Sequence, residues 1–154
     1  MMKFGDFFDS DDVIPDLAAA TKEEALAELV ARLAERHPEL DREEALRSIM
    51  ERERLGSTGI GGGLAISHAK VRYAGGPMML FGRSRTGIAF DALDGMPVHL
   101  FFLLLADTDT VETHLKLLAR ISRLLKDRAL RGRLLEAADA DSLYSIIKEQ
   151  DGLL

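Results

Sequence analysis

The chain has 154 residues, which is the length of one domain, and 47% of them are hydrophobic and 30% charged. The apolar fraction excludes intrinsic disorder. The absence of cysteine excludes disulfides, thiolate metal sites and cysteine nucleophiles. The formal net charge of −6 disfavours nucleic acid as a partner, because a duplex-binding surface has to neutralise many phosphates.

The N-terminal segment MMKFGDFFDSDD has one lysine, four aspartates and no apolar stretch, so we do not expect a secretory signal. The longest apolar run, Leu100–Ala106, is far shorter than the roughly 20 residues of a membrane span. We therefore expect no membrane insertion and a cytoplasmic protein.

The first half of the chain predicts a short edge strand at residues 13–15 and two helices. Thr21 lies three residues before a glutamate, a capping-box spacing, and apolar residues then recur at helical intervals over residues 21–36. Asp41 has the same spacing and predicts a second helix that ends near Leu55.

The second half predicts three strands and then helices. The strands are expected over residues 64–71, 78–84 and 98–106, and the last is apolar almost throughout, as in a central strand covered on both faces. Helical segments are expected to begin near residues 110, 127 and 141. The order indicates one α/β domain over residues 1–154, with three α/β/α layers and helices on both faces of a small mixed sheet.

The segment from Gly56 to Gly63 contains five glycines, which argues against regular structure. Amide groups exposed in such a loop can bind anions, although a flexible turn is an equally good interpretation. The segment lacks the lysine of a Walker A loop and does not open a helix as a dinucleotide fingerprint does.

Two histidines are candidates for chemistry. His68 follows the glycine loop near the end of a short predicted strand, where an exposed neutral imidazole can act as a nucleophile. His114 lies early in the helix after the apolar strand, and a structural histidine is the simpler interpretation there. His99 is expected to be structural and His37 solvated. No spacing predicts a metal site, so no metal or cofactor is expected.

A basic stretch, rich in lysine and arginine, follows His114, and its only acidic residue is Asp127. Such charges usually line a solvated helix face, but they could also dock an acidic partner or pair with the acidic N-terminus. Its members are Lys116, Arg120, Arg123, Lys126, Arg128, Arg131 and Arg133.

The segment from Arg52 to His68, RERLGSTGIGGGLAISH, resembles the active-site segment of the IIA domains of the bacterial phosphoenolpyruvate-dependent sugar phosphotransferase system. The similarity is to the fructose/mannitol class, and especially to its stand-alone nitrogen-regulatory member. It continues through IAFDALDGMPV at residues 88–98 and HLKLLARI at residues 114–121, and covers about residues 13–150.

The resemblance implies that His68 accepts a phosphoryl group from a phosphohistidine carrier such as HPr, on Nε2. It implies that Arg52 neutralises phosphate charge and that His114 is a second imidazole in the site. A IIB domain or regulatory target proteins are the implied onward partners. The candidate phosphate-binding residues are Ser57, Thr58, Gly59, Gly61, Gly62 and Ser67.

Two positions depart from the family pattern, in which a proline usually precedes the active histidine and a polar residue usually stands where Gly62 does. Ser67, in place of that proline, could loosen the loop or donate a hydrogen bond to the phosphoryl oxygens. Two alternatives therefore remain open: a regulatory binding module that phosphorylation of His68 switches, and a degenerate member without transfer activity.

Overall fold

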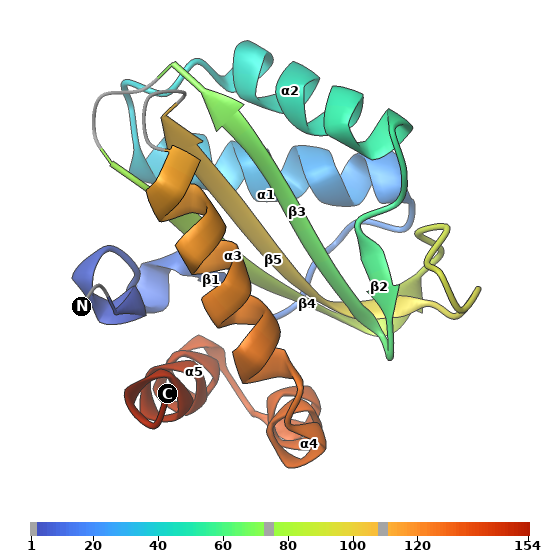
Figure 1. Ribbon diagram of the computed structural model, residues 1–154. Coiled ribbons are helices and arrows are strands. Elements are labelled where there is room, and N and C mark those ends of the chain that lie inside the picture. Colours follow the sequence, from blue (N-terminus) through green and yellow to red (C-terminus); the bar gives the residue numbers. More distant parts are fainter. Residues whose placement is uncertain (1–2, 73–75, 108–110) are drawn as a thin grey trace.

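The computed structural model describes residues 3–72, 76–107 and 111–154. Its centre is a five-stranded mixed sheet with the strand order β1-β4-β5-β3-β2 (Figure 1). The strands are β1 Val13–Ile14, β2 Gly59–Gly61, β3 Leu64–Val71, β4 Met78–Ile88 and β5 Val98–Asp107. Strand β5 lies in the middle, antiparallel to β4 and parallel to β3.

The central position of β5 explains its apolar sequence, because both of its faces are covered. Phe101 and Leu103 belong to one hydrophobic cluster, while Phe102 and Leu104 belong to the other. The predicted central strand is confirmed. The predicted edge strand also forms, as β1, although only Val13 and Ile14 pair with β4.

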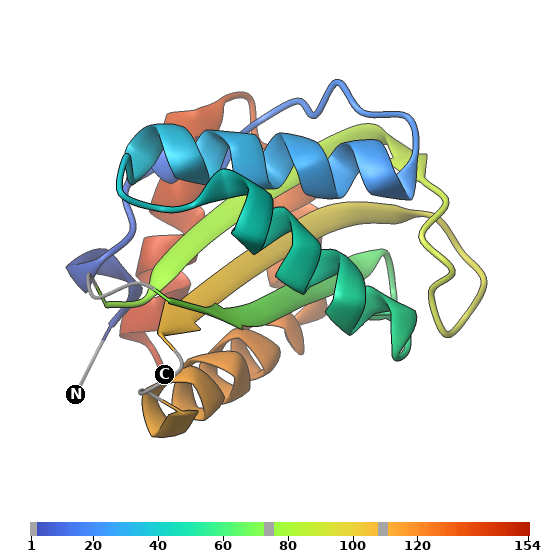
Figure 2. The same ribbon diagram turned by 90° about the horizontal axis from the view of Figure 1, so that it is seen from above.

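One face of the sheet is covered by α1 (Lys22–Arg36) and α2 (Arg42–Arg54), which cross it side by side (Figure 2). Both helices begin where the sequence predicts. The side chain of Thr21 accepts a hydrogen bond from the Glu24 amide, and Asp41 accepts one from Glu44. These caps satisfy amide groups that the first helical turn leaves without partners.

The opposite face is covered by α3 (Val111–Leu125), α4 (Arg128–Glu136) and α5 (Ala140–Gly152). Figure 1 shows these three helices on the other side of the sheet from α1 and α2. The three-layer α/β/α prediction is confirmed. Residue 110, where the first of these helices was expected to begin, lies outside the described residues.

Two expectations about local structure are wrong. The glycine segment is not wholly irregular, because Gly59–Gly61 forms β2 and pairs antiparallel with the start of β3. Within the residues that the structure describes, the carboxylates of the acidic N-terminus form no ion pair with the basic stretch. They surround Arg36 of α1 instead, with Asp9 at 2.9 Å and Asp12 at 3.0 Å.

In the part of the chain that the structure describes, no helix has the length and apolar character needed to cross a membrane.

Candidate functional site

His68 lies in the interior of β3. The sequence analysis had predicted a position near the end of the strand. Strand β2 pairs with β3 only as far as Ala65, so β3 is a sheet edge where His68 stands. The imidazole is half-buried, and its Nδ1 lies 3.2 Å from the carbonyl oxygen of Ile66. Because a carbonyl can only accept, Nδ1 carries the proton and donates. The lone pair of the neutral ring is therefore on Nε2.

The surroundings of His68 favour the neutral, nucleophilic ring. Burial lowers the pKa of His68, and the positive charge of Arg52 lowers it further. The hydrogen bond to Ile66 and the carboxylate of Glu53 act in the opposite direction, but the net shift of the pKa is downward. The ring is therefore mostly unprotonated at neutral pH.

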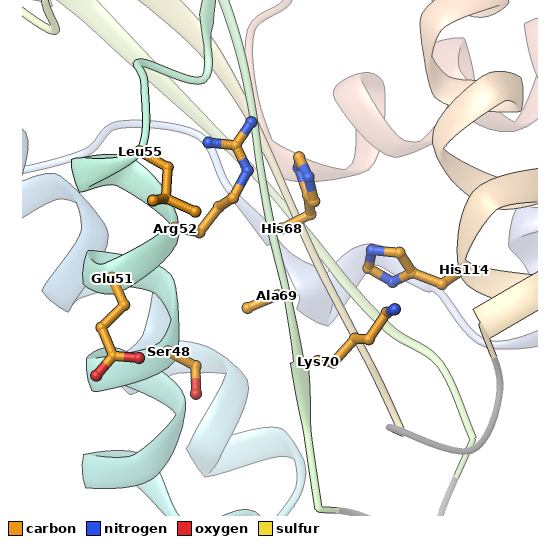
Figure 3. A pocket seen from close by; sticks show the side chains of 8 residues that line it. All are labelled: Ser48, Glu51, Arg52, Leu55, His68, Ala69, Lys70 and His114. Atoms are coloured by element: carbon orange, nitrogen blue, oxygen red, sulfur yellow. The ribbon is translucent and has the colours of Figure 1, made fainter.

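His68 opens into two adjoining surface pockets. The larger, of about 510 Å³, brings together residues of α2, β3 and α3 (Figure 3): Ser48, Glu51, Arg52, Leu55, His68, Ala69, Lys70 and His114. The smaller, of about 230 Å³, lies on the side of the glycine loop. It shares Arg52 and His68 with the first and adds Ser57, Thr58, Ile60, Ile66, Leu118 and Ser122.

His114, on α3, is the second imidazole of the larger pocket, and the centroid of its ring lies 5.6 Å from that of His68. The side chain is only 3% exposed. Burial, with smaller contributions from His68 and Lys70, lowers the pKa of His114 to about 4. Its Nδ1 is buried and has no hydrogen-bond partner among the residues that the structure describes. His114 is therefore a neutral, incompletely satisfied ring next to the candidate nucleophile.

Arg52 stands on the other side of His68, in the last turn of α2 (Figure 3). Its Nη1 donates to the carbonyl oxygen of Gly56 at 2.9 Å, which ties the start of the glycine segment to the helix. Among the described residues, the other guanidinium nitrogens have no hydrogen-bond partner. They remain available to an anion in either pocket.

A buried network beneath the loop was missed by the sequence analysis. The carboxylate of Glu53 accepts from the amide of Thr58 at 2.9 Å and from its hydroxyl at 2.6 Å, and forms an ion pair with Lys22 at 2.8 Å. Burial by itself would raise the pKa of Glu53, but Lys22 and Thr58 outweigh it and lower the pKa. The spacing of Glu53 to Thr58 in sequence gives no signal of this contact, because it depends on the loop folding back over α2.

Ser67 belongs to this network. Adjacent residues of a strand point to opposite faces, so Ser67 faces α2 with Ala65 while His68 faces α3 with Ile66. The Ser67 side chain is 1% exposed, and its hydroxyl lies 3.1 Å from that of Thr58. A hydrogen bond from Ser67 to the phosphoryl oxygens, one of two expectations for this residue, does not fit this geometry.

The glycine segment is only partly directed at His68. The Ser57 hydroxyl donates to the carbonyl of Phe90, and the amide of Gly62 donates to the carboxylate of Asp94 at 2.9 Å. The structure thus brings four candidates into the His68 pockets: Arg52, Ser57, Thr58 and His114. Four others do not line them: Gly59, Gly61, Gly62 and Ser67.

The other histidines lie elsewhere. His99 is held by a hydrogen bond between its Nδ1 and the carbonyl of Ser84 at 2.9 Å. His37 follows the last residue of α1 and is half-buried, and burial lowers its pKa. Within residues 3–72, 76–107 and 111–154, no cluster of three or more His, Asp or Glu side chains is placed to hold a metal ion.

Comparison with known proteins assigns this arrangement to a family. The family model described as "Phosphoenolpyruvate-dependent sugar phosphotransferase system, EIIA 2" matches residues 6–150. The chain belongs to this family. The resemblance found in the sequence is thereby confirmed, and the family consists of phosphotransfer proteins.

Two curated relatives with different names match most of the chain. The "Nitrogen regulatory protein" of Bradyrhizobium diazoefficiens is 38% identical over 146 residues, which cover 95% of each chain. The "PTS system fructose-specific EIIABC component" of Bacillus subtilis is 36% identical over 150 residues, or 97% of this chain. The match spans only 24% of that longer relative.

Solved structures share the fold of this EIIA protein. The nitrogen regulatory protein IIA-Ntr of Neisseria meningitidis superposes with a TM-score of 0.86 at 28% identity, over 94% of this chain and 98% of that one. The IIA mannitol protein of Escherichia coli has a TM-score of 0.76 at 19% identity, over 91% and 98% of the two chains. At that identity the similarity concerns the fold alone.

Proposed function

We propose that this EIIA protein is a phosphocarrier whose His68 accepts a phosphoryl group on Nε2 from a phosphohistidine carrier such as HPr or its nitrogen-related counterpart. One observation carries the proposal. The Nδ1 proton of His68 is held by the Ile66 carbonyl, which leaves Nε2 as the nucleophile in a pocket shared with Arg52 and His114. EIIA family membership supports the same reaction.

The transfer needs one bond to form and one to break. Nε2 of His68 attacks the phosphorus in line, and the electron pair of the breaking P–N bond returns to the donor imidazole. Charge that develops on the equatorial oxygens is met by Arg52, whose guanidinium borders both pockets at His68. The protein's task is therefore positioning and charge stabilisation.

The test is incubation with phosphoenolpyruvate, enzyme I and HPr, followed by intact mass spectrometry under conditions that preserve acid-labile phosphate. Wild type and His114→Ala should gain one phosphoryl group, the variant more slowly, and His68→Ala none. His37→Ala is the matched control and should behave like wild type. A label that persists in His68→Ala would refute the assignment. An unlabelled wild type beside a labelled reference EIIA protein would identify a degenerate member.

The onward step is proposed from the fructose-specific relative, in which the matched region is part of an EIIABC chain. A IIB domain would take the phosphoryl group from His68. Adding a purified fructose-type IIB domain to the isolated, labelled protein tests this, since the label should move to the added domain. Retention of the label on this chain would exclude that partner.

A second candidate is a regulatory binding module, favoured by relatives that bear the name nitrogen regulatory protein. In that case phosphorylation adds negative charge at His68 and changes which proteins bind. Affinity capture with wild type and His68→Asp should then recover different partners. Identical partner sets for both would contradict a switch.

A further inference from the structure

A second cationic pocket lies on the α4 face of the sheet. It has a volume of about 310 Å³ and is lined by Arg83, Arg85, His99 and Leu135. It forms where the second half of β4 and the first residues of β5 meet α4. None of these four residues lines the pockets at His68. The volume is at the lower end of the roughly 300–1,000 Å³ typical of small-ligand sites.

Arg83 is fully buried, and three of its five guanidinium donors are used. Nε donates to the carbonyl of Pro15 at 2.9 Å, and Nη1 donates to the carbonyls of Leu134 at 2.9 Å and Ala137 at 2.6 Å. Nη2 is buried and has no hydrogen-bond partner in the described part of the chain. A buried charged donor in this condition is costly, and an anion would satisfy it.

The carboxylate of Asp16 lies near both arginines but forms a hydrogen bond only with Arg85. The carboxylate of Asp16 lies 2.5 Å from Nε of Arg85, but 4.0 Å from Nη2 of Arg83, which is too long for a hydrogen bond. Burial and the neighbouring Arg85 both lower the pKa of Arg83. Two guanidinium groups thus share one carboxylate, and the pocket keeps an excess of positive charge.

The remaining walls complete a binding site. His99 lines the pocket beside the two arginines, and its Nδ1 is held by the carbonyl of Ser84. Leu135, 44% exposed, adds an apolar wall that a free inorganic ion does not need. We propose that this pocket binds the phosphate group of a small phosphate ester, with the organic part of the ester against Leu135.

This site is independent of phosphotransfer at His68, and its test removes that histidine. The full-length His68→Ala protein is titrated with glycerol 3-phosphate and, separately, with inorganic phosphate, by calorimetry and by NMR of the arginine side chains. The ester should bind more tightly than inorganic phosphate and perturb the signals of Arg83 and Arg85. Equal affinity for the two probes would overturn the assignment to an ester.

Arg85→Gln should weaken binding about tenfold or more, because it removes a charged donor from the site. Arg133→Gln is the matched control: Arg133 is an exposed arginine of α4 that pairs with Glu149 and lies outside the pocket. Asp16→Asn should tighten binding, since it removes the competing carboxylate. Equal effects of Arg85→Gln and Arg133→Gln, or no binding of either probe at millimolar concentration, would overturn the site.

Discussion

Phosphorylation of His68 should cause His114 to take up a proton. Before transfer the pKa of His114 is about 4 because the ring is buried. Protonating it at pH 7 therefore costs about 4 kcal/mol, at about 1.4 kcal/mol per pH unit. A neutral His114 cannot offset the charge of a phosphoryl group. Whether the ring becomes protonated therefore depends on whether its attraction to that group exceeds the cost of about 4 kcal/mol.

The ring separation gives the scale of the attraction. At 5.6 Å, the distance between the two ring centroids, opposite unit charges attract by about 3 kcal/mol with an effective dielectric constant of about 20. A phosphoryl group carries a charge of about −1.5 to −2, so the attraction is about 4–6 kcal/mol. This equals or exceeds the cost of protonation. The pKa of His114 should therefore rise towards neutrality or above it when His68 is phosphorylated.

Nitrogen-15 NMR of the histidine rings over a pH series measures this directly in the free and phosphorylated protein. His114 should titrate near pH 4 in the free protein and near or above pH 7 in the phosphorylated one. His37, half-buried just after α1 and outside both pockets at His68, serves as the internal control, and its lowered pKa should be the same in both proteins. A neutral His114 ring at pH 6 in the phosphorylated protein would refute the reasoning.

Three other substitutions test the site and its support. Arg52→Gln should slow phosphorylation about a hundredfold in rapid-quench assays, because it removes a charged donor from the transferring group. It should lower stability by only about 1 kcal/mol, through loss of the hydrogen bond to Gly56. Glu53→Gln should lower the free energy of unfolding in urea by about 3 kcal/mol, since the ion pair and hydrogen bonds of Glu53 are buried. The folded pKa of Glu53 lies below its ordinary value of 4.5, so this contribution is complete above that pH and disappears as the pH falls through the folded pKa. Gly87→Ala should cost about 2 kcal/mol in the same assay, because φ is +85° and a Cβ would lie 2.9 Å from the His99 ring.

Matched controls separate these effects from general damage. Glu51→Gln changes an exposed glutamate of the same helix and should leave stability unchanged. Gly95→Ala changes a glycine with φ of +70° in open space, so it should cost only the backbone strain, about 1 kcal/mol. Equal losses for Glu53→Gln and Glu51→Gln, or for Gly87→Ala and Gly95→Ala, would contradict the burial and contact arguments respectively.

Local patterns were sufficient for most of the fold. Thr21 and Asp41 cap the helices that their spacing predicts, because a cap is a contact over three residues. The apolar run of β5 identified the central strand, because only a strand covered on both faces is apolar throughout. The short β2 was missed, since Gly59–Gly61 is held by pairing with β3 and has little strand preference of its own.

The roles of the site residues remain predictions, but the structure shows where each residue lies. His68, Arg52 and His114 were found through a resemblance, and the structure places them around one pocket. The position of Ser67 on the opposite face follows from strand alternation and was available from the sequence.

The sequence by itself determined the helices, the central strand, the family and the candidate nucleophile, because each is encoded in neighbouring residues or in a continuous motif. Only the tertiary structure decided the protonation of His114, the role of Glu53 and the unsatisfied donors of Arg83. The physical reason is that burial and hydrogen-bond partners set these properties. They come from segments far apart in the chain, which meet only when the helices pack on the sheet.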